Sequence, residues 1–389
     1  MSQQETPSIT LLEELLSAPS PSGYEQPASS LWRQAVKGYA DDVKADVLGN
    51  SYAILNAAGS PKVMLAGHCD EIGFIVRHIT SQGYIYFGPI GGHDANIVVG
   101  QRVYVHTIDH GKILGVIGKK PIHLMDAKER EKNTVLHELF VDIGATSGKD
   151  VLARVSVGDP ITYAAPFQRL EGDLVVAHAI DDKVGAFVVA ETVRLLAQER
   201  ASELQAGVFG VCTVQEEVGL RGARTSSYVT GATVGVAIDV GHASDYPGVD
   251  KRRTGEADLG KGPVITRGPN INPQVFKLLI EAAHAEDIPY QVDANGAGTG
   301  TDANAMQLNQ GGMATALVSI PLRYMHTPCE VMSLSDAHNA SRLLAAFIRR
   351  LTPDVDFTPS LENLRPPRIR RAKAAADAAS ASDEQSEDS

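Results

Sequence analysis

Apolar and polar positions follow two different rhythms along this chain, and the change between them predicts how it is organised. Short apolar runs typical of buried strands lie at 43–47, 52–55, 63–66, 174–177, 208–214, 234–238 and 315–320. Helical spacing of apolar residues is found at 9–16, 26–38, 183–198, 275–286 and 334–351. Strands that alternate with helices indicate an α/β fold with a doubly wound, mostly parallel sheet.

Between residues 73 and 167 the pattern changes to short β-rich runs separated by glycine turns, for example at 84–87, 102–106 and 113–117. Closely spaced strands of this kind predict a small all-β domain. We therefore expect 1–72 and 168–355 to be two parts of one catalytic α/β domain, interrupted by a β-rich insertion at 73–167. The Ala/Ser/Asp/Glu bias of 366–389 predicts a disordered acidic tail.

Composition narrows the class of protein. The 389 residues are 43% hydrophobic, enough for a large core, and the net charge is −12. Five acidic residues after Arg371 against Lys373 put −4 of this charge in the tail and leave −8 in the body, which argues against a nucleic-acid partner. No apolar run approaches the ~18 residues of a membrane span, so no membrane association is expected.

Cysteine usage and the start of the chain predict a compartment. Cys69, Cys212 and Cys329 form neither a CxxC pair nor an even set, so a disulfide framework is not expected. The first residues lack a basic segment followed by an apolar one, the pattern of a secretion signal. We expect the protein in the reducing cytoplasm.

Five polar stretches, far apart in the sequence, each follow an apolar run and carry side chains of the metal-ligand type. They are His68-Cys69-Asp70, Asp181-Asp182, Glu216-Glu217, Asp239 and His326. Because open α/β sheets place their sites at the carboxyl ends of the strands, we expect these stretches to converge. Two imidazoles with several carboxylates are what a two-metal hydrolase requires.

The first two stretches suggest specific roles. Alternation along a strand puts His68 and Asp70 on one side, so Asp70 can accept a hydrogen bond from the second ring nitrogen of a metal-bound His68. Asp181 can bridge two cations through its two oxygens. Asp182 would then support it or cap the following helix.

The other three stretches leave choices open. Adjacent Glu216 and Glu217 suggest that one binds metal while the other acts as general base. Asp239 can complete one metal site, in competition with His242 and Asp245, and His326 can complete the other. Mixed imidazole and carboxylate ligands suit zinc or cobalt, with manganese also compatible, and two divalent ions per subunit are expected.

Other catalytic motifs are absent. His137-Glu138 lacks the second histidine of HExxH, and no GxSxG sequence occurs. The segment Gly296–Gly300 does not fit the dinucleotide-binding pattern, and we interpret it as a flexible loop that could contact a substrate.

The order of these stretches resembles that of the co-catalytic metallopeptidases, and most closely the tetrahedral aminopeptidase family, which includes glutamyl and deblocking aminopeptidases. The resemblance covers roughly residues 9–351. It is carried by Gly67–Phe74, Gly115–Gly118, Ile180–Gly185, Thr213–Gly222, Gly300–Ala303 and Ser319–Pro328. Cys69 and Lys183 depart from the residues common in relatives at their positions.

This resemblance implies a function and a role for each site residue. The activity would be removal of N-terminal residues from peptides, with the β insertion mediating dimers that build a hollow homododecamer. By analogy His68 and Asp239 bind one metal, Glu217 and His326 bind the other, and Asp181 bridges. Glu216 would be the general base and Asp70 would orient His68.

Two other functions remain open at this point. One is a related dinuclear metal amidohydrolase, such as a dipeptidase or an N-acyl amino acid deacylase, which a panel of aminoacyl-p-nitroanilides and N-acyl amino acids would separate from an aminopeptidase. The other is a non-catalytic peptide-binding or assembly protein, which would not hold two metal ions per chain.

Overall fold

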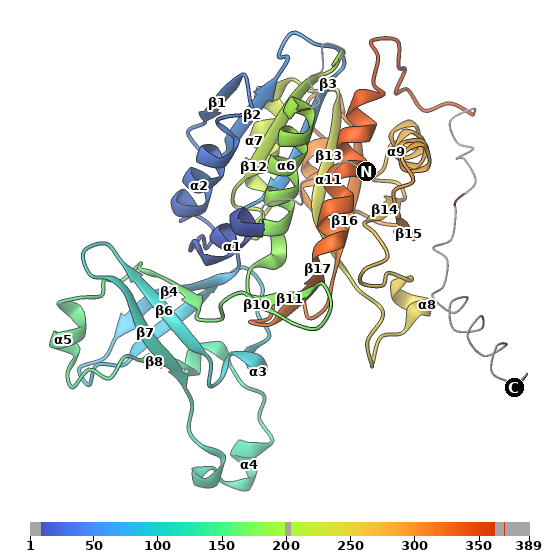
Figure 1. Cartoon of the computed structure of the whole chain (residues 1–389). Coiled ribbons are helices and arrows are strands. Elements are labelled where there is room, and N and C mark those ends of the chain that lie inside the picture. The colour runs from blue at the N-terminus through green and yellow to red at the C-terminus, as the bar shows by residue number, and fades with distance from the viewer. Residues whose placement is uncertain (1–8, 199–203, 362–368, 370–389) are drawn as a thin grey trace, which may run out of the picture.

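The computed structural model describes residues 9–198, 204–361 and 369, and it has two parts (Figure 1). A large α/β part holds a sheet covered by helices, and a β-barrel lies beside it. The predicted tail at 366–389 lies, apart from Ile369, outside the described residues. None of the helices in the described part of the chain combines the length and the apolar character needed to cross a bilayer.

Most of the apolar runs predicted as strands lie together in the main sheet. Its order within the described residues is β1 (Asp42–Ala45), β2 (Ser51–Leu55), β12 (Gly207–Thr213), β3 (Lys62–His68), β13 (Val234–His242), β16 (Ala314–Leu322), β14 (Val264–Arg267) and β15 (Gln291–Ala294). The central strands β12, β3, β13 and β16 are parallel, and β12 is buried along its whole length, as expected for a strand covered on both faces. The antiparallel strands β1 and β2 pair at one edge.

Helices cover both faces of this sheet. One face carries α1 (Ile9–Ser17), α2 (Gln26–Val36), α6 (Ile180–Gln198), α9 (Pro273–Ala285) and α11 (Leu334–Arg349). The other face carries α7 (Arg221–Thr230) and α10 (Asp302–Gln307). The doubly wound α/β architecture predicted from the sequence is confirmed, and the sheet is mixed, because β2 runs antiparallel to β12 and β14 runs antiparallel to β16.

One predicted strand has a different partner from the one that the α/β alternation suggested. Leu174–Ala177 is a strand, β11, but it pairs with β10 (Gln168–Arg169) and β17 (Glu330–Ser333) in a separate three-stranded sheet. Its residues are alternately buried and half-buried, so only one face is covered, whereas the strands of the main sheet are covered on both. The small sheet places β17 directly beside the start of α6.

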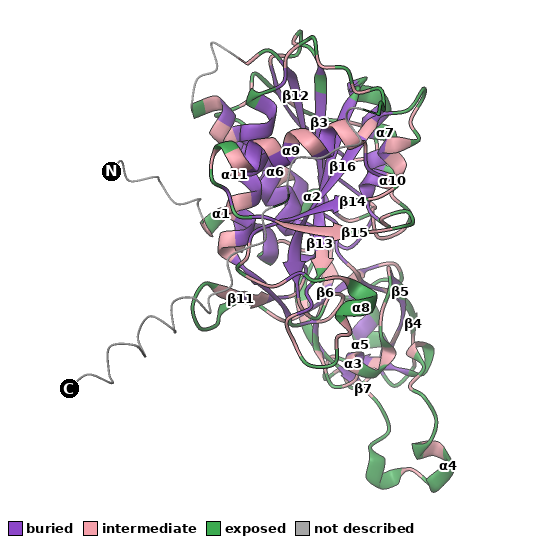
Figure 2. Ribbon diagram, turned by 90° about the vertical axis from the view of Figure 1, so that its right-hand side faces the viewer, coloured by how far each residue is buried: buried purple, intermediate pink, exposed green. Residues whose placement is uncertain are grey.

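The barrel is closed and has a core of its own. Its strands follow the order β4 (Gly73–Ile79), β5 (Ile85–Ile90), β8 (Phe140–Asp142), β7 (Gly111–Gly118), β6 (Arg102–Thr107) and β9 (Pro160–Tyr163). Its apolar cluster is separate from that of the α/β part. Short helices α3 (Ala95–Val98) and α5 (Gly148–Leu152) lie at its periphery, and α4 (Ala127–Arg130), with 3₁₀ turns at Ile122–Leu124 and Leu136–Glu138, forms a mostly exposed arm (Figure 2).

Helix α6 lies against β3 with backbone touching backbone. A Cβ atom at Gly67 would lie only 2.3 Å from the carbonyl carbon of Gly185, and such contacts do not occur in real structures. Further along α6, the indole nitrogen of Trp32 donates to the carbonyl oxygen of Ala186 at 2.8 Å. The last residue of β3 and the first turn of α6 are therefore held closely together.

Candidate metal centre

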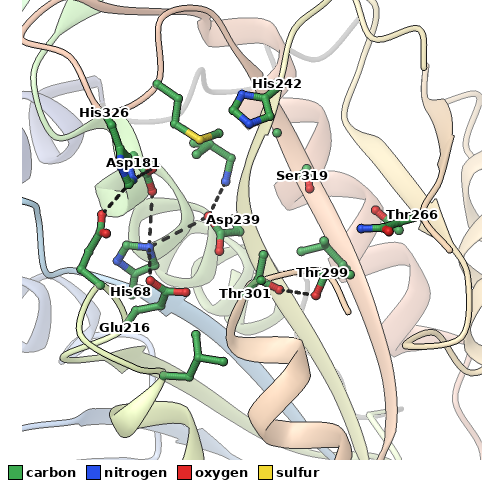
Figure 3. A pocket seen from close by; sticks show the side chains of 18 of the residues that line it. His68, Asp181, Glu216, Asp239, His242, Thr266, Thr299, Thr301, Ser319 and His326 are labelled. Atoms are coloured by element: carbon green, nitrogen blue, oxygen red, sulfur yellow. Dashed lines mark hydrogen bonds and ion pairs between the residues drawn. The ribbon is translucent and has the colours of Figure 1, made fainter. Parts of the chain in front are cut away.

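The five polar stretches meet in one cavity of about 590 Å³ (Figure 3). His68 ends β3, Asp239 is the sixth of the nine residues of β13, and Glu216 with Glu217 follows β12. His326 follows β16, and Asp181 lies in the first turn of α6. All but Asp181 therefore lie in the carboxyl-terminal halves of the parallel strands or directly after them.

The side chains form two groups of potential metal ligands that share one residue. His68, Asp181 and Asp239 make the first group, and Asp181, Glu217 and His326 make the second. Within each group the ligand atoms lie within 4.8 Å of one another. The structure thus gathers all five predicted ligands into two adjacent sites.

Asp181 faces both groups through different oxygens. Its Oδ1 atom lies 3.4 Å from Nε2 of His68, and its Oδ2 atom lies 3.2 Å from Nε2 of His326. Nε2 of His68 is 4.0 Å from Oδ1 of Asp239, and Nε2 of His326 is 3.4 Å from Oε1 of Glu217. Donors 2.0–2.2 Å from a tetrahedral zinc lie about 3.4 Å from each other, so these separations fit metal coordination.

The chemistry of the donors also fits cations. Oε1 of Glu217 is buried and accepts no hydrogen bond, so this oxygen is available to a metal ion. The Asp181 and Glu217 carboxylates raise the pKa of His326 to about 11. Burial alone would lower the pKa of His68, but Asp181 and Asp70 outweigh it and raise that pKa well above its usual value. Divalent ions can take the place of these shared protons, because ligands bind metal in their deprotonated forms.

Glu216 stands apart from both ligand groups but faces the same space. Its Oε2 atom is 3.9 Å from Nε2 of His68. Burial, joined by the negative charges of Asp239 and Asp302 and opposed by His68, raises the pKa of Glu216 to about 9. The structure therefore distinguishes the adjacent glutamates, since Glu217 belongs to a ligand group and Glu216 does not.

Asp70 makes several hydrogen bonds around this centre, and they differ in part from the expectation. Its carboxylate accepts hydrogen bonds from the backbone N–H groups of Glu216 at 3.0 Å and Glu217 at 3.2 Å and from the Ser22 hydroxyl at 2.7 Å. The closest acceptor to Nδ1 of His68 is instead the carbonyl oxygen of Asp70, at 3.1 Å, with the carboxylate at 3.5 Å. Either contact leaves Nε2 free to face the cavity.

Two further buried carboxylates hold the ligand segments. Asp182 accepts from the backbone N–H of His68 at 3.2 Å and of Gly185 at 3.0 Å, so it both caps α6 and ties it to β3. Glu330, at the start of β17, accepts from the N–H of Asp181 at 3.1 Å and of His326 at 2.8 Å. Glu330 was not predicted from sequence, because it lies in a short strand without a distinctive pattern.

Lys183, which follows Asp182, forms a buried ion pair. Its buried ammonium group donates to the Glu71 carboxylate at 2.9 Å and to the Ala18 carbonyl oxygen at 2.7 Å. Burial would raise the pKa of Glu71, but Lys183 and His178 outweigh it and hold that pKa well below its usual range. Lys183 is not among the residues that line the cavity, nor is the buried Cys69.

The structure also distinguishes Asp239 from His242 and Asp245, the two other residues considered as possible metal ligands. His242 lines the cavity without joining either ligand group, and Asp245 pairs with Arg323 at 2.6 Å. Thr299 and Gly300, from the loop interpreted as a possible substrate contact, line the cavity with Thr301. Thr266 and Asp293, on strands that the sequence analysis did not identify, form part of the same wall.

Comparison with known proteins places this arrangement in a family. A family model described as M42 glutamyl aminopeptidase matches residues 49–343. The lysyl aminopeptidase of Pyrococcus furiosus is 38% identical over 352 residues, which are 90% of this chain and 99% of the relative.

Solved structures agree with the sequence comparison. A TET aminopeptidase from the marine sediment archaeon Thaumarchaeota archaeon SCGC AB-539-E09 superposes with a TM-score of 0.84 at 35% identity, covering 92% of this chain and 98% of that one. The TET1 peptidase of Pyrococcus horikoshii, described as able to assemble into a tetrahedron or a large octahedral shell, superposes with a TM-score of 0.78 at 30% identity. That match covers 88% of this chain and 99% of the peptidase.

Proposed function

Because the chain belongs to the M42 glutamyl aminopeptidase family, we propose that it removes N-terminal residues from peptides with the aid of two divalent metal ions and a glutamate general base. His68 and Asp239 would hold one ion, Glu217 and His326 the other, and Asp181 both. Zinc or cobalt suits this set of nitrogen and oxygen ligands, and manganese is also compatible.

The observation that carries the proposal is the position of Asp181. Its two oxygens face histidines of different ligand groups, at 3.4 and 3.2 Å, and each group adds a second carboxylate. A structural carboxylate buried at a helix start would need no pair of imidazoles on opposite sides. The four carboxylates Asp181, Glu216, Glu217 and Asp239 also carry the charge needed to balance two divalent ions.

The residues of the chain then have separate tasks. Bound metal ions would supply an activated water and polarise the scissile carbonyl group. Glu216 takes a proton from the attacking water and later gives it to the leaving amine, so that one carboxylate serves both half-steps. Asp70 orients the segment that carries both glutamates, and Glu330 orients Asp181 and His326.

Paired substitutions of the two neighbouring glutamates test this assignment. Glu216→Gln should reduce kcat for an aminoacyl-p-nitroanilide by about 10²–10⁴-fold, the range for loss of a general base, and should keep two metal ions per chain by elemental analysis. Glu217→Gln should lose metal together with activity. Near-normal turnover in Glu216→Gln would remove that residue as the base, and a single ion or none in the native protein would remove the dinuclear centre.

Self-association through the β insertion is also part of the proposal. Strand β7 exposes Leu114 and Val116 while Ile117 is buried, and the following turn exposes Ile122 and Leu124 by 59% and 69%. Neighbouring exposed apolar side chains of this kind are typical of interaction surfaces. By analogy with the tetrahedral assembly of the P. horikoshii peptidase and with a second similar structure described as a dodecamer, we propose a homododecamer.

We further propose that the protein works in the cytoplasm. Cys69, Cys212 and Cys329 are all free thiols, and Cys69 and Cys212 remain so although they are neighbours in the core. Free cysteines are typical of a reducing compartment. Detection of the protein in a cytosolic fraction, and not in secreted material, is the measurement that checks this.

A further inference from the structure

The segment that follows β12 carries both glutamates, and three of its consecutive backbone N–H groups are held by buried carboxylates. Asp70 accepts from the N–H of Glu216 at 3.0 Å and from that of Glu217 at 3.2 Å. The N–H of Gln215, directly before them, donates to Oε1 of Glu25 at 3.2 Å. Two side chains from distant parts of the sequence therefore share the task of holding this segment.

Glu25 directly precedes α2 and lies behind the cavity. Its side chain is 3% exposed, and it is not among the residues that line the cavity. The same Oε1 atom also accepts from the N–H of Gly23 at 2.6 Å, so one oxygen serves two backbone donors. Glu25 therefore acts on the reacting groups only through the backbone of Gln215.

Two serines just before Glu25 hold the segment after β3 in a similar way. The hydroxyl group of Ser20 donates to the carbonyl oxygen of Cys69 at 2.7 Å. The hydroxyl group of Ser22 donates to the carboxylate of Asp70, also at 2.7 Å. One short stretch of the chain thus contacts both segments that carry site residues, the one after β3 and the one after β12.

The backbone at Gln215 needs such support. Its φ angle is +55°, in the left-handed region that residues with a Cβ atom rarely adopt. A residue stays in that conformation only where surrounding contacts maintain it. The hydrogen bond to Glu25 is one of these contacts, and it acts at the residue from which the chain continues to Glu216.

The two glutamates depend on this support to different degrees. Glu217 belongs to a ligand group with His326, where a metal ion would anchor the end of its side chain. No hydrogen bond holds the carboxylate of Glu216 within the described part of the chain, and its ion pair with His68 is long, at 3.9 Å (Figure 3). The position of the Glu216 carboxylate is therefore set mainly by the backbone.

We propose that Glu25 is a positioning residue for the general base, because its hydrogen bond to the N–H of Gln215 keeps the Glu216 carboxylate directed at the space between the ligand groups. The inference rests on the aminopeptidase function proposed above and adds a residue to that machinery. A small displacement of the backbone at Gln215 should then slow proton transfer without changing substrate binding or metal binding.

The charge of Glu25 is not what this role requires. Burial raises the pKa of Glu25 to about 7, with the negative charge of Asp70 adding to the rise and the N–H groups of Gly23 and Gln215 opposing it. Near neutral pH the side chain is therefore partly uncharged, and a carboxyl group still offers an acceptor oxygen when it is protonated. We expect the length of this side chain, and not its charge, to determine activity.

Two conservative substitutions separate length from charge. Glu25→Gln keeps the length and the acceptor oxygen but removes the charge. Glu25→Asp keeps the charge but is shorter by one carbon–carbon bond, about 1.5 Å, which is too short to keep a hydrogen bond that is already 3.2 Å long. Glu14→Asp is the matched control, because it makes the same change at an exposed position of α1.

The test measures kcat, KM and metal content of the full-length, metal-loaded protein with an aminoacyl-p-nitroanilide that it cleaves. Glu25→Asp should lower kcat by about 10–100-fold, as a misplacement of about 1 Å does, and should keep the native KM and two metal ions per chain. Glu25→Gln and Glu14→Asp should both have a kcat close to the native value.

The same substitution in the Glu216→Gln protein distinguishes positioning of the base from a general structural role. If Glu25 acts only through Glu216, Glu25→Asp should cause little further loss of the residual kcat. A structural role would lower kcat by the same factor whether or not Glu216 is present.

Three results would overturn the inference and leave the aminopeptidase function intact. They are a higher kcat in Glu25→Asp than in Glu25→Gln, an equal loss in the native and Glu216→Gln backgrounds, and a loss of metal ions in Glu25→Asp. A native protein that cleaves no aminoacyl-p-nitroanilide would instead overturn the proposed function.

Discussion

Replacing Lys183 with methionine should destabilise the protein through the charge that it leaves behind on Glu71. The two side chains are fully buried, at 0% and 1% exposure, and their charged atoms are 2.9 Å apart. Methionine keeps most of the length and volume of the lysine stem but removes the cation. The carboxylate of Glu71 would keep the N–H of Ser20, at 2.8 Å, and His178, at 3.2 Å.

The expected magnitude follows from the burial of the pair. Breaking a buried ion pair from one side costs about 3–5 kcal/mol, because an uncompensated charge remains inside. Since Ser20 and His178 still contact Glu71, we expect the lower end, about 3 kcal/mol at pH 8. In Glu71→Gln/Lys183→Met no charge is left, and the main loss is the donor to the Ala18 carbonyl oxygen, so about 1–2 kcal/mol is expected.

The effect should also depend on pH, and its sign can be stated. The native pKa of Glu71 is held below that of the unfolded chain, so its ionised form contributes stability above about pH 4 that is lost as the pH falls further. Without Lys183, burial dominates and the pKa of Glu71 rises. Protonation then relieves the variant at low pH, and the difference from the native protein should be smaller at pH 5.5 than at pH 8.

The assay is urea unfolding followed by the fluorescence of Trp32, the single tryptophan of the chain. Trp32 is buried and donates to Ala186 on α6, the helix that carries Lys183, so it reports on the affected region. Protein concentration must be equal in all samples because assembly adds to apparent stability. Lys277→Met is the matched control, since it removes only a surface pair with Glu281 at 4.0 Å and should cost under about 0.5 kcal/mol.

Two results would refute this reasoning. A Lys183→Met variant within about 1 kcal/mol of the native protein would show that the pair is not a buried charge pair in solution. A double variant as unstable as the sum of the two single variants would show that the two side chains act independently.

Two other predictions follow from the site and the barrel. Glu330→Gln offers one acceptor oxygen to the N–H groups of Asp181 and His326 where the native side chain offers two, and we expect about 10–100-fold weaker metal binding in competition with a chelator. Unaltered metal affinity would exclude Glu330 as a positioning residue. Ile122→Asp/Leu124→Asp places charges on the exposed arm, and light scattering should show smaller assemblies than the native protein forms, whereas an unchanged particle mass would exclude the arm as an interface.

Much of the α/β fold could be predicted because its central strands are apolar on both faces. In runs such as the one ending at Thr213, polar residues do not alternate with apolar ones. A polar side chain that would be unfavourable inside a buried strand follows each run. That combination located the carboxyl ends of the strands. It therefore located His68, Glu217 and Asp239, which the structure brings together.

The remaining features depend on contacts that no local pattern encodes. β14 and β15 have four residues each, too few for a period to show, so Thr266 and Asp293 could not be assigned to the cavity. Glu330 and Glu71 are ordinary acidic residues in sequence, and their roles arise only because distant backbone N–H groups or Lys183 lie beside them. The contact between His68 and the Asp70 carbonyl oxygen likewise depends on how the chain bends after β3.

Gly67 lies in close contact with Gly185, and neither residue has a side chain beyond hydrogen. The absence of side chains at these two positions therefore sets how closely the segments bearing His68 and Asp181 can approach. A single added methyl group at Gly67 would lie 2.3 Å from the helix backbone and would have to displace one segment from the other by more than an ångström. Such a shift is several times larger than the tolerance of a metal–ligand distance, which is about 0.2 Å. A substitution that leaves every proposed ligand residue in the chain would in this way disrupt the proposed metal centre.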